Sequence, residues 1–138
     1  MHEEPAGCRV VRAEGISVSF DPGCGIVAAL RVTDDAREVA PLHRAPWVGT
    51  PEADAIEAPH LARLSGDFLC APFGAREDGA PLHGWTANAP WHVVEAGGAV
   101  LRAALSRPVR GALVVKELGL EDGHPFLYQR HLFVGGEG

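Results

Sequence analysis

Basic residues are scarce in this chain, and lysine is nearly absent. The sequence has 12 Lys and Arg residues against 18 Asp and Glu residues, which gives a formal net charge of -6, and Lys116 is the only lysine. The arginines form no cluster, whereas a protein that binds nucleic acid or an anionic membrane presents a basic patch. We therefore expect no nucleic acid and no membrane as partner, and a neutral small molecule suits this charge better.

Cysteine is also sparse and is not arranged for disulfides or metal. Cys8, Cys24 and Cys70 are the three cysteines, and they form no Cys-x-x-Cys pair. An odd number without such spacing indicates neither a secreted disulfide framework nor a zinc site. We expect a protein of the reducing cytoplasm, and an inert buried thiol at Cys70 because its neighbours Leu69 and Ala71 are apolar.

Motifs for cofactors, metals and targeting are missing as well. The sequence has no Gly-x-Gly-x-x-Gly, no phosphate-binding loop with its lysine, and no His-x-His pair that would place two ligands on one side of a strand. The acidic Glu3-Glu4 pair lies where a secretory signal would be basic, and no apolar run approaches the roughly 20 residues that cross a bilayer. We expect no cofactor, no metal and no membrane anchor.

The 138 residues suffice for one domain with a real core. Hydrophobic residues make up 46% of the chain and charged residues 22%, as is usual for globular proteins. Several segments alternate apolar and polar residues between Gly, Pro or Asp turns, which is typical of strands with one buried face. The predicted strands cover residues 15–20, 26–33, 38–43, 91–95, 99–106, 112–120 and 126–134, with a tight hairpin turn at Gly97-Gly98.

This pattern predicts an all-β fold, an antiparallel β-sandwich or barrel, because short strands about ten residues apart leave no room for βαβ units. Residues 44–63 contain three prolines and little periodicity, so we expect a surface loop with one helical turn. The sequence stops at Gly138, directly after an apolar strand. We therefore expect residues 1–138 to be a single, incomplete sandwich domain, with an exposed sheet edge that favours self-association.

The segment from Leu64 to Trp91 gathers the candidates for a functional site. His83 stands in Leu-His-Gly-Trp, where Gly84 permits a close backbone approach and Trp85 offers a flat apolar face. A histidine moves protons near neutral pH, and an aromatic face can cover the C–H side of a pyranose. This combination predicts a sugar site with His83 as its catalytic residue. The alternative is a turn histidine beside a core tryptophan.

Asp67 and Asn88 are the candidate polar ligands for such a sugar, together with Trp85 as the stacking surface. A carboxylate accepts hydrogen bonds from hydroxyls, and an amide both donates and accepts them. Both residues also suit turns, which leaves that alternative open. Phe68, Phe73 and Trp91 are predicted to pack in the core, since large aromatic side chains are mainly buried.

The order of these elements resembles the aldose 1-epimerase, or galactose-mutarotase-like, family. In that family a large antiparallel β-sandwich carries a His-Gly pair after a strand and loop, then a Trp-containing strand, then paired strands with a Gly-rich or Asp-Gly turn. The matching pieces here are His83-Gly84, Trp91-His-Val-Val94, the 99–106 strand and residues 118–127. The resemblance covers roughly residues 10–138 and implies the N-terminal half of a galactose-mutarotase-like supersandwich.

The resemblance implies acid/base ring opening and closure of a sugar hemiacetal. In the family a glutamate takes the anomeric proton, a second histidine protonates the ring oxygen, and the His-Gly histidine assists there. Only the last maps onto this chain, at His83, and Gly66-Asp-Phe68 stands where the epimerases carry an Asn-Arg. We expect a carbohydrate-binding aldose 1-epimerase-like isomerase when complete, with this chain alone inactive. The alternative is a non-catalytic sugar-binding or structural β-sandwich domain.

Overall fold

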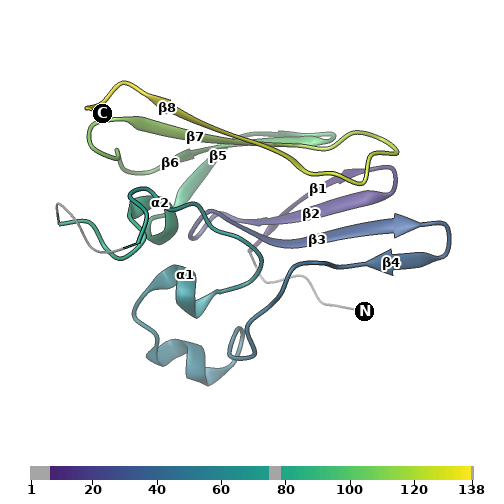
Figure 1. The fold of residues 1–138 in the computed structure, drawn as a ribbon, viewed down its shortest axis with the longest axis horizontal. Coiled ribbons are helices and arrows are strands. Elements are labelled where there is room, and N and C mark those ends of the chain that lie inside the picture. The colour runs from purple at the N-terminus through teal and green to yellow at the C-terminus, as the bar shows by residue number, and fades with distance from the viewer. Residues whose placement is uncertain (1–6, 75–78, 138) are drawn as a thin grey trace.

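Two antiparallel sheets dominate the computed structural model, which describes residues 7–74 and 79–137 (Figure 1). The first sheet has the strand order β1-β2-β3-β4 and the second β5-β6-β7-β8. The strands are β1 (Arg9–Ala13), β2 (Ile16–Asp21), β3 (Ile26–Asp34), β4 (Arg37–Val39), β5 (Trp91–Gly97), β6 (Val100–Leu105), β7 (Leu113–Gly119) and β8 (Tyr128–Val134). The prediction of an all-β antiparallel fold is confirmed.

The predicted strands reappear as β2 to β8, because alternating side chains and turn residues mark them in the sequence. Gly98 has a φ of 57° in the β5–β6 hairpin, a backbone conformation that glycine adopts without strain. The strand predicted over 38–43 is shorter in the structure and ends at Val39. β1 was not predicted, because Val10 and Val11 stand side by side between arginines and show no alternation; only Val11 is buried.

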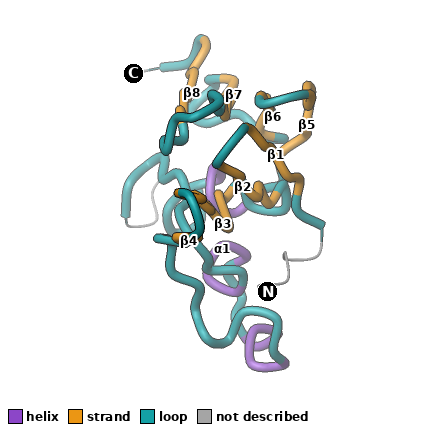
Figure 2. Tube along the Cα trace, turned by 90° about the vertical axis from the view of Figure 1, so that its right-hand side faces the viewer, coloured by secondary structure: helices purple, strands orange, loops and turns teal. Residues whose placement is uncertain are grey.

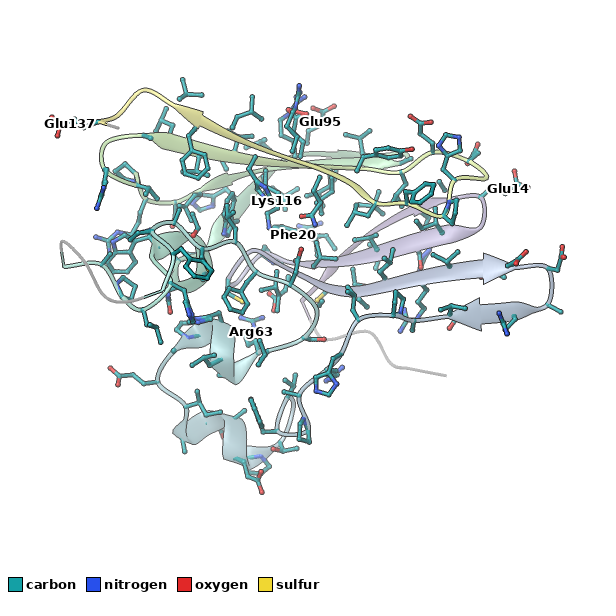
Figure 3. The ribbon with its side chains drawn as sticks, viewed as in Figure 1. Glu14, Phe20, Arg63, Glu95, Lys116 and Glu137 are labelled. Atoms are coloured by element: carbon teal, nitrogen blue, oxygen red, sulfur yellow. The ribbon has the colours of Figure 1, made fainter. Side chains whose placement is uncertain are left out.

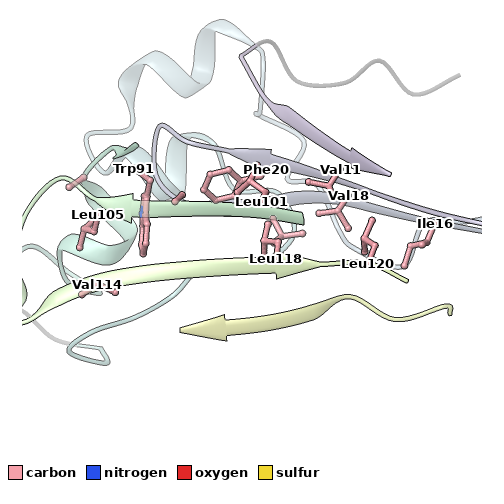
Figure 4. Close-up of a cluster of buried hydrophobic side chains, with 13 residues drawn as sticks. Val11, Ile16, Val18, Phe20, Trp91, Leu101, Leu105, Val114, Leu118 and Leu120 are labelled. Atoms are coloured by element: carbon pink, nitrogen blue, oxygen red, sulfur yellow. The ribbon is translucent and has the colours of Figure 1, made fainter. Parts of the chain in front are cut away.

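The two sheets pack face to face around a shared apolar core (Figure 4). Val18 and Phe20 of β2 belong to the same buried cluster as Leu101 of β6 and Leu118 of β7. Burying one such side chain stabilises the fold by about 1.5–3 kcal/mol, so this cluster holds the layers together. Its buried members are Val11, Ile16, Val18, Phe20, Val27, Ala89, Trp91, Leu101, Ala103, Leu105, Val114, Leu118 and Leu120.

The charged side chain of Lys116 lies inside this sheet interface. Lys116 of β7 is 1% exposed, and its Nζ donates a hydrogen bond to the carbonyl oxygen of Gly25 in the first sheet's β2–β3 turn (Figure 3). The Nζ atom lies 5.8 Å from the ring centroid of Phe20 and 5.4 Å from that of Trp91. Burial lowers the pKa of Lys116, while the charge of Asp67 raises it. The chain's only lysine therefore links the two layers.

Among the described residues, three short helices lie outside the sheets: η1 (Pro51–Ala55), α1 (Pro59–Ala62) and α2 (Trp85–Asn88). Figures 1 and 2 both show α1 on the side of the first sheet that faces away from β5–β8. In the described ranges no helix has the length and apolar character needed to cross a membrane. The expectation that residues 44–63 run over the surface holds for η1, which has no buried residue, but is wrong for His60, which is fully buried.

The aromatic residues predicted for the core have different surroundings. Trp91 is buried in the main cluster. Phe68 is half-buried and packs against a second, smaller cluster that includes Cys24 and Ile26, on the other face of the first sheet. The prediction is wrong for Phe73, which is 88% exposed because it lies in a loop outside both sheets.

A matched pair of substitutions tests the packing of the two layers. Leu101 is 0% exposed in the core, whereas Leu113 on the neighbouring strand is 64% exposed. We expect Leu101→Ala to lower the free energy of unfolding by about 2–5 kcal/mol, because it removes buried contacts and leaves a cavity. Leu113→Ala should change it by less than about 0.5 kcal/mol. Urea denaturation measures both, and equal losses would contradict face-to-face packing.

Candidate functional site

Two histidines far apart in the sequence meet beside the sheets. His60 comes from α1 and is fully buried, and His83 comes from the turn before α2 and is half-buried. The Nε2 atom of His60 lies 2.8 Å from Nδ1 of His83, a hydrogen-bond distance. The rings meet edge to face, with their centroids 4.9 Å apart and their planes at 80°. We call His60 and His83 the histidine pair.

Asn88, at the end of α2, holds the other side of His60. Its Oδ1 lies 3.0 Å from Nδ1 of His60. Its Nδ2 donates hydrogen bonds to the carbonyl oxygens of Leu82, at 2.8 Å, and Gly84, at 2.7 Å. The structure therefore places this predicted sugar ligand within the chain's own hydrogen-bond network, where both amide hydrogens and the amide oxygen already have partners.

The backbone around His83 is unusual for a residue with a side chain. His83 has a φ of 66°, in the left-handed region that costs a non-glycine residue about 1–3 kcal/mol. Gly84 follows with a φ of 78°, and a Cβ atom there would lie 1.9 Å from the carbonyl oxygen of Ala71. The close approach that the sequence suggested for Gly84 is thus required, and the surrounding bonds hold His83 in a strained conformation.

The environment of the histidine pair is apolar on one side. The ring of Phe68 lies 4.8 Å from the centroid of His60 and 5.3 Å from that of His83. Burial lowers the pKa of His60, the hydrogen bond to Asn88 raises it, and the neighbouring charge of His83 lowers it. Because burial has the largest effect, His60 is neutral at pH 7.

Trp85 lies next to the histidine pair in sequence but lines a separate hollow. The guanidinium of Arg107 lies 3.5 Å from the centroid of its ring, which covers one aromatic face. Trp85 and Asn88 border an apolar hollow of about 410 Å³, and His83 is not among the described residues that line it. The lining residues are Ile56, Glu57, Ala58, Pro59, Leu61, Pro81, Leu82, Trp85 and Asn88.

Asp67 links the two sheets. Its Oδ1 accepts a hydrogen bond of 3.0 Å from the backbone N–H of Val27 on β3, and its Oδ2 accepts one of 2.9 Å from Nε2 of Gln129 on β8. Its neighbour Gly66 has a φ of 72° and leaves no room for a side chain, because a Cβ would lie 1.8 Å from the carbonyl oxygen of Val27. No hydrogen bond joins Asp67 to His83 in the described part of the chain. Each carboxylate oxygen keeps a further lone pair for a ligand.

The sequence did not point to His60. The segment Ala58-Pro59-His60 has the proline that often begins a helix, which is a local signal only. Nothing in the spacing links it to His83, because the contact arises from the way α1 and the turn before α2 pack. A buried histidine carries no mark in the sequence that separates it from an exposed one.

The possible metal ligands and the cysteine thiols offer little further chemistry. Among the described residues, no group of three or more His, Cys, Asp or Glu side chains could hold a metal ion. Burial raises the pKa of Cys24 to about 12, with a further contribution from Asp21. Cys70 is half-buried rather than buried, and burial raises its pKa also. Thiols with raised pKa values are poor nucleophiles, in agreement with the inert role predicted for Cys70.

The lowered pKa of His60 predicts a dependence of stability on pH. Because the unfolded chain holds this proton more tightly than the folded chain, stability should fall as the pH drops below about 6.5, and His60 should contribute at most about 1.4 kcal/mol per pH unit to that fall. His60→Gln removes the titrating group but keeps a donor and an acceptor, so the slope should decrease. Part of the slope should remain, since burial also lowers the pKa of His131.

Urea denaturation between pH 5 and pH 8 measures this slope. His92 lies exposed on β5, which makes His92→Gln the matched control, with a slope like that of the parent chain. A slope that His60→Gln leaves unchanged would show that His60 is not buried in its neutral form.

Comparisons with protein-family models, with curated proteins and with solved structures find no match to this chain. The site is defined by its own distances, burial and hydrogen bonds. These describe a buried histidine that is bonded to Asn88 on one side and to the half-buried, strained imidazole of His83 on the other, beside two packed antiparallel sheets.

Proposed function

We propose that this chain binds an aldose beside His83, and that the imidazole exchanges a proton with the sugar in the manner of an aldose 1-epimerase. The observation that carries the proposal is the 2.8 Å hydrogen bond between Nδ1 of His83 and the buried His60. It fixes the ring of His83, and no described residue bonds to the opposite ring atom, Nε2. A fixed, half-buried imidazole with one ring nitrogen left for a ligand is suited to general acid–base chemistry.

The proposed reaction conserves protons and needs no cofactor. Opening a pyranose breaks the bond between C1 and the ring oxygen, while a proton leaves the anomeric hydroxyl and another reaches the ring oxygen. Closing on the other face of C1 gives the other anomer. By the family resemblance, His83 acts at the ring oxygen. The family's glutamate and second histidine map onto no residue here, so the proposal assigns this chain one of three proton-transfer groups.

The surroundings of His83 supply the other features of a sugar site. The Phe68 ring, with its centroid 5.3 Å from that of His83, offers an apolar surface for the C–H face of a pyranose. Asp67 keeps acceptor capacity for hydroxyls, and Trp85 borders a hollow next to the site. Asn88 enters the proposal only through His60, because its polar atoms are already bonded.

We extend the proposal to the fold, as the N-terminal half of a galactose-mutarotase-like supersandwich. The support is the edge strand β8, whose inner face is partly uncovered. Phe133 pairs with the buried Val114 of β7 yet is 46% exposed. An apolar side chain at such a position favours cover by further strands. Cover by a second copy of the chain is the alternative.

A non-catalytic structural or sugar-binding sandwich is the second candidate, and specific contacts favour it. Arg107 occupies one face of Trp85, and the amide of Asn88 has all its polar atoms in internal hydrogen bonds. In this case the histidine pair is packing that stabilises the turn before α2. A purely structural sandwich differs from the proposal in that no sugar changes the environment of His83, and a non-catalytic sugar-binding sandwich differs in that His83 does not affect the rate of anomer exchange.

Titration with glucose or galactose, followed by NMR of the histidine and tryptophan side chains, separates them. The proposal predicts saturable shifts of the His83 ring signals at millimolar sugar. His83→Ala should weaken binding about 3- to 10-fold, the effect of losing one hydrogen bond of ordinary strength. His92→Ala, at the exposed position on β5, should bind like the parent chain.

A sugar that leaves the His83 signals unchanged throughout the millimolar range would refute the binding proposal and support the structural role. Polarimetry on a longer form that includes the family's glutamate and second histidine tests the proton transfer. There His83→Ala should slow anomer exchange by about 10²- to 10⁴-fold, the usual contribution of general acid–base catalysis. Equal rates of anomer exchange in His83→Ala and the parent protein would show that His83 takes no part in the proton transfer.

A further inference from the structure

We propose that His60 is a positioning residue that fixes the tautomer of His83, so that neutral His83 carries its proton on Nδ1 and presents a bare Nε2 to the ligand. This inference deepens the proposed function and rests on it for the identity of the ligand. The tautomer itself follows from the hydrogen bonds among His83, His60 and Asn88. Their donors and acceptors are compatible with only one placement of the ring hydrogens.

The assignment begins at Asn88. Its Nδ2 lies 2.8 Å from the carbonyl oxygen of Leu82 and 2.7 Å from that of Gly84. Both partners are acceptors only, so the atom between them must be the NH₂ group, which has two hydrogens to donate. In the flipped orientation the amide oxygen would face two carbonyl oxygens without any hydrogen. The amide oxygen is therefore the atom that faces His60.

The second step fixes His60. Because the Asn88 oxygen can only accept, Nδ1 of His60 must carry a hydrogen across the 3.0 Å contact. Burial lowers the pKa of His60, so the ring is neutral at pH 7 and holds a single ring hydrogen. That hydrogen is on Nδ1, and Nε2 is left with a lone pair. His60 is thus an acceptor at the atom that faces His83.

The third step fixes His83. Across the 2.8 Å contact, Nε2 of His60 needs a hydrogen from its partner, and Nδ1 of His83 is the atom that supplies it. In its neutral form His83 then has no hydrogen on Nε2 and accepts a proton there. When it has gained that proton, the imidazolium keeps its Nδ1–H bond to His60 and can donate from Nε2 to a ring oxygen.

The hydrogen bonds from His83 to His60 and from His60 to Asn88 do not move a positive charge from His83 to the buried His60. A proton passed from His83 to His60 would place an imidazolium at a fully buried position, which burial disfavours. An amide oxygen offers no basic site to take the Nδ1 proton onward. The positive charge of the protonated pair therefore stays on His83, at the partly exposed ring where a ligand can use it.

NMR of the ¹⁵N-labelled histidine rings tests this in the parent chain without sugar, above pH 7. The two ring nitrogens of a neutral histidine give distinct signals for N–H and for a bare nitrogen. We expect His83 to show N–H at Nδ1 and a bare Nε2. The reversed pattern, or an equal mixture of both forms, would overturn the inference even if every variant failed to fold.

Two variants of His60 separate positioning from packing. His60→Gln keeps an acceptor for His83 and a donor for Asn88, so it should preserve the tautomer of His83. His60→Leu fills similar space but has no acceptor, so the tautomer ratio should shift by about 10-fold, the effect of one hydrogen bond of ordinary strength. A ratio that His60→Leu leaves unchanged in a folded protein would refute the positioning role.

The same variants distinguish this inference from the proposed function. In the sugar titration of this chain, His60→Leu should weaken binding by up to the factor expected for His83→Ala, because Nε2 of His83 then loses its preference for the bare form, and His60→Gln should restore the affinity. Equal affinities for all three proteins would refute the role of His60 in presenting His83 to the sugar. An Nδ1–H tautomer in a chain that no sugar perturbs would refute the proposed function and confirm the control of His83 by His60.

Discussion

A hydrogen bond between two imidazoles determines the character of this site. Nε2 of His60 and Nδ1 of His83 lie 2.8 Å apart, and only one of these rings reaches solvent. Burial keeps His60 neutral, and Asn88 fixes which of its nitrogens can accept. The partly exposed ring of His83 thereby has a defined orientation, and no described residue bonds to its Nε2 atom. The proposed proton transfer by His83 depends on that arrangement.

The scaffold supports this bond through segments that are distant in sequence. The two sheets pack around one apolar core, and Lys116 and Asp67 link them with hydrogen bonds to Gly25 and Val27 of the first sheet. The loop after Asp67 carries the aromatic ring that lies against both histidines. The left-handed backbone at His83 costs about 1–3 kcal/mol, which these contacts offset. Strain of this kind is common where a side chain must be presented in one direction.

The strands could be predicted from sequence, because alternation in segments such as residues 16–20 reports directly which face is buried. β1 could not, since its paired valines do not alternate and its register is set by pairing with β2. For the site, the sequence pointed to His83 through its neighbour Gly84, whose lack of a side chain is required by the packing against Ala71. It could not point to His60, because burial and a contact between distant segments are properties of the fold. The hydrogen bonds of Asn88 to His60, Leu82 and Gly84 could not be predicted for the same reason.

The central claim is that His60 and His83 share one hydrogen. A ¹⁵N–¹⁵N scalar coupling across that hydrogen bond, measured in labelled protein above pH 7, tests it most directly. The account predicts a coupling between Nε2 of His60 and Nδ1 of His83, with the shared hydrogen protected from exchange with water. Two uncoupled rings, with a rapidly exchanging hydrogen on Nδ1 of His83, would contradict it.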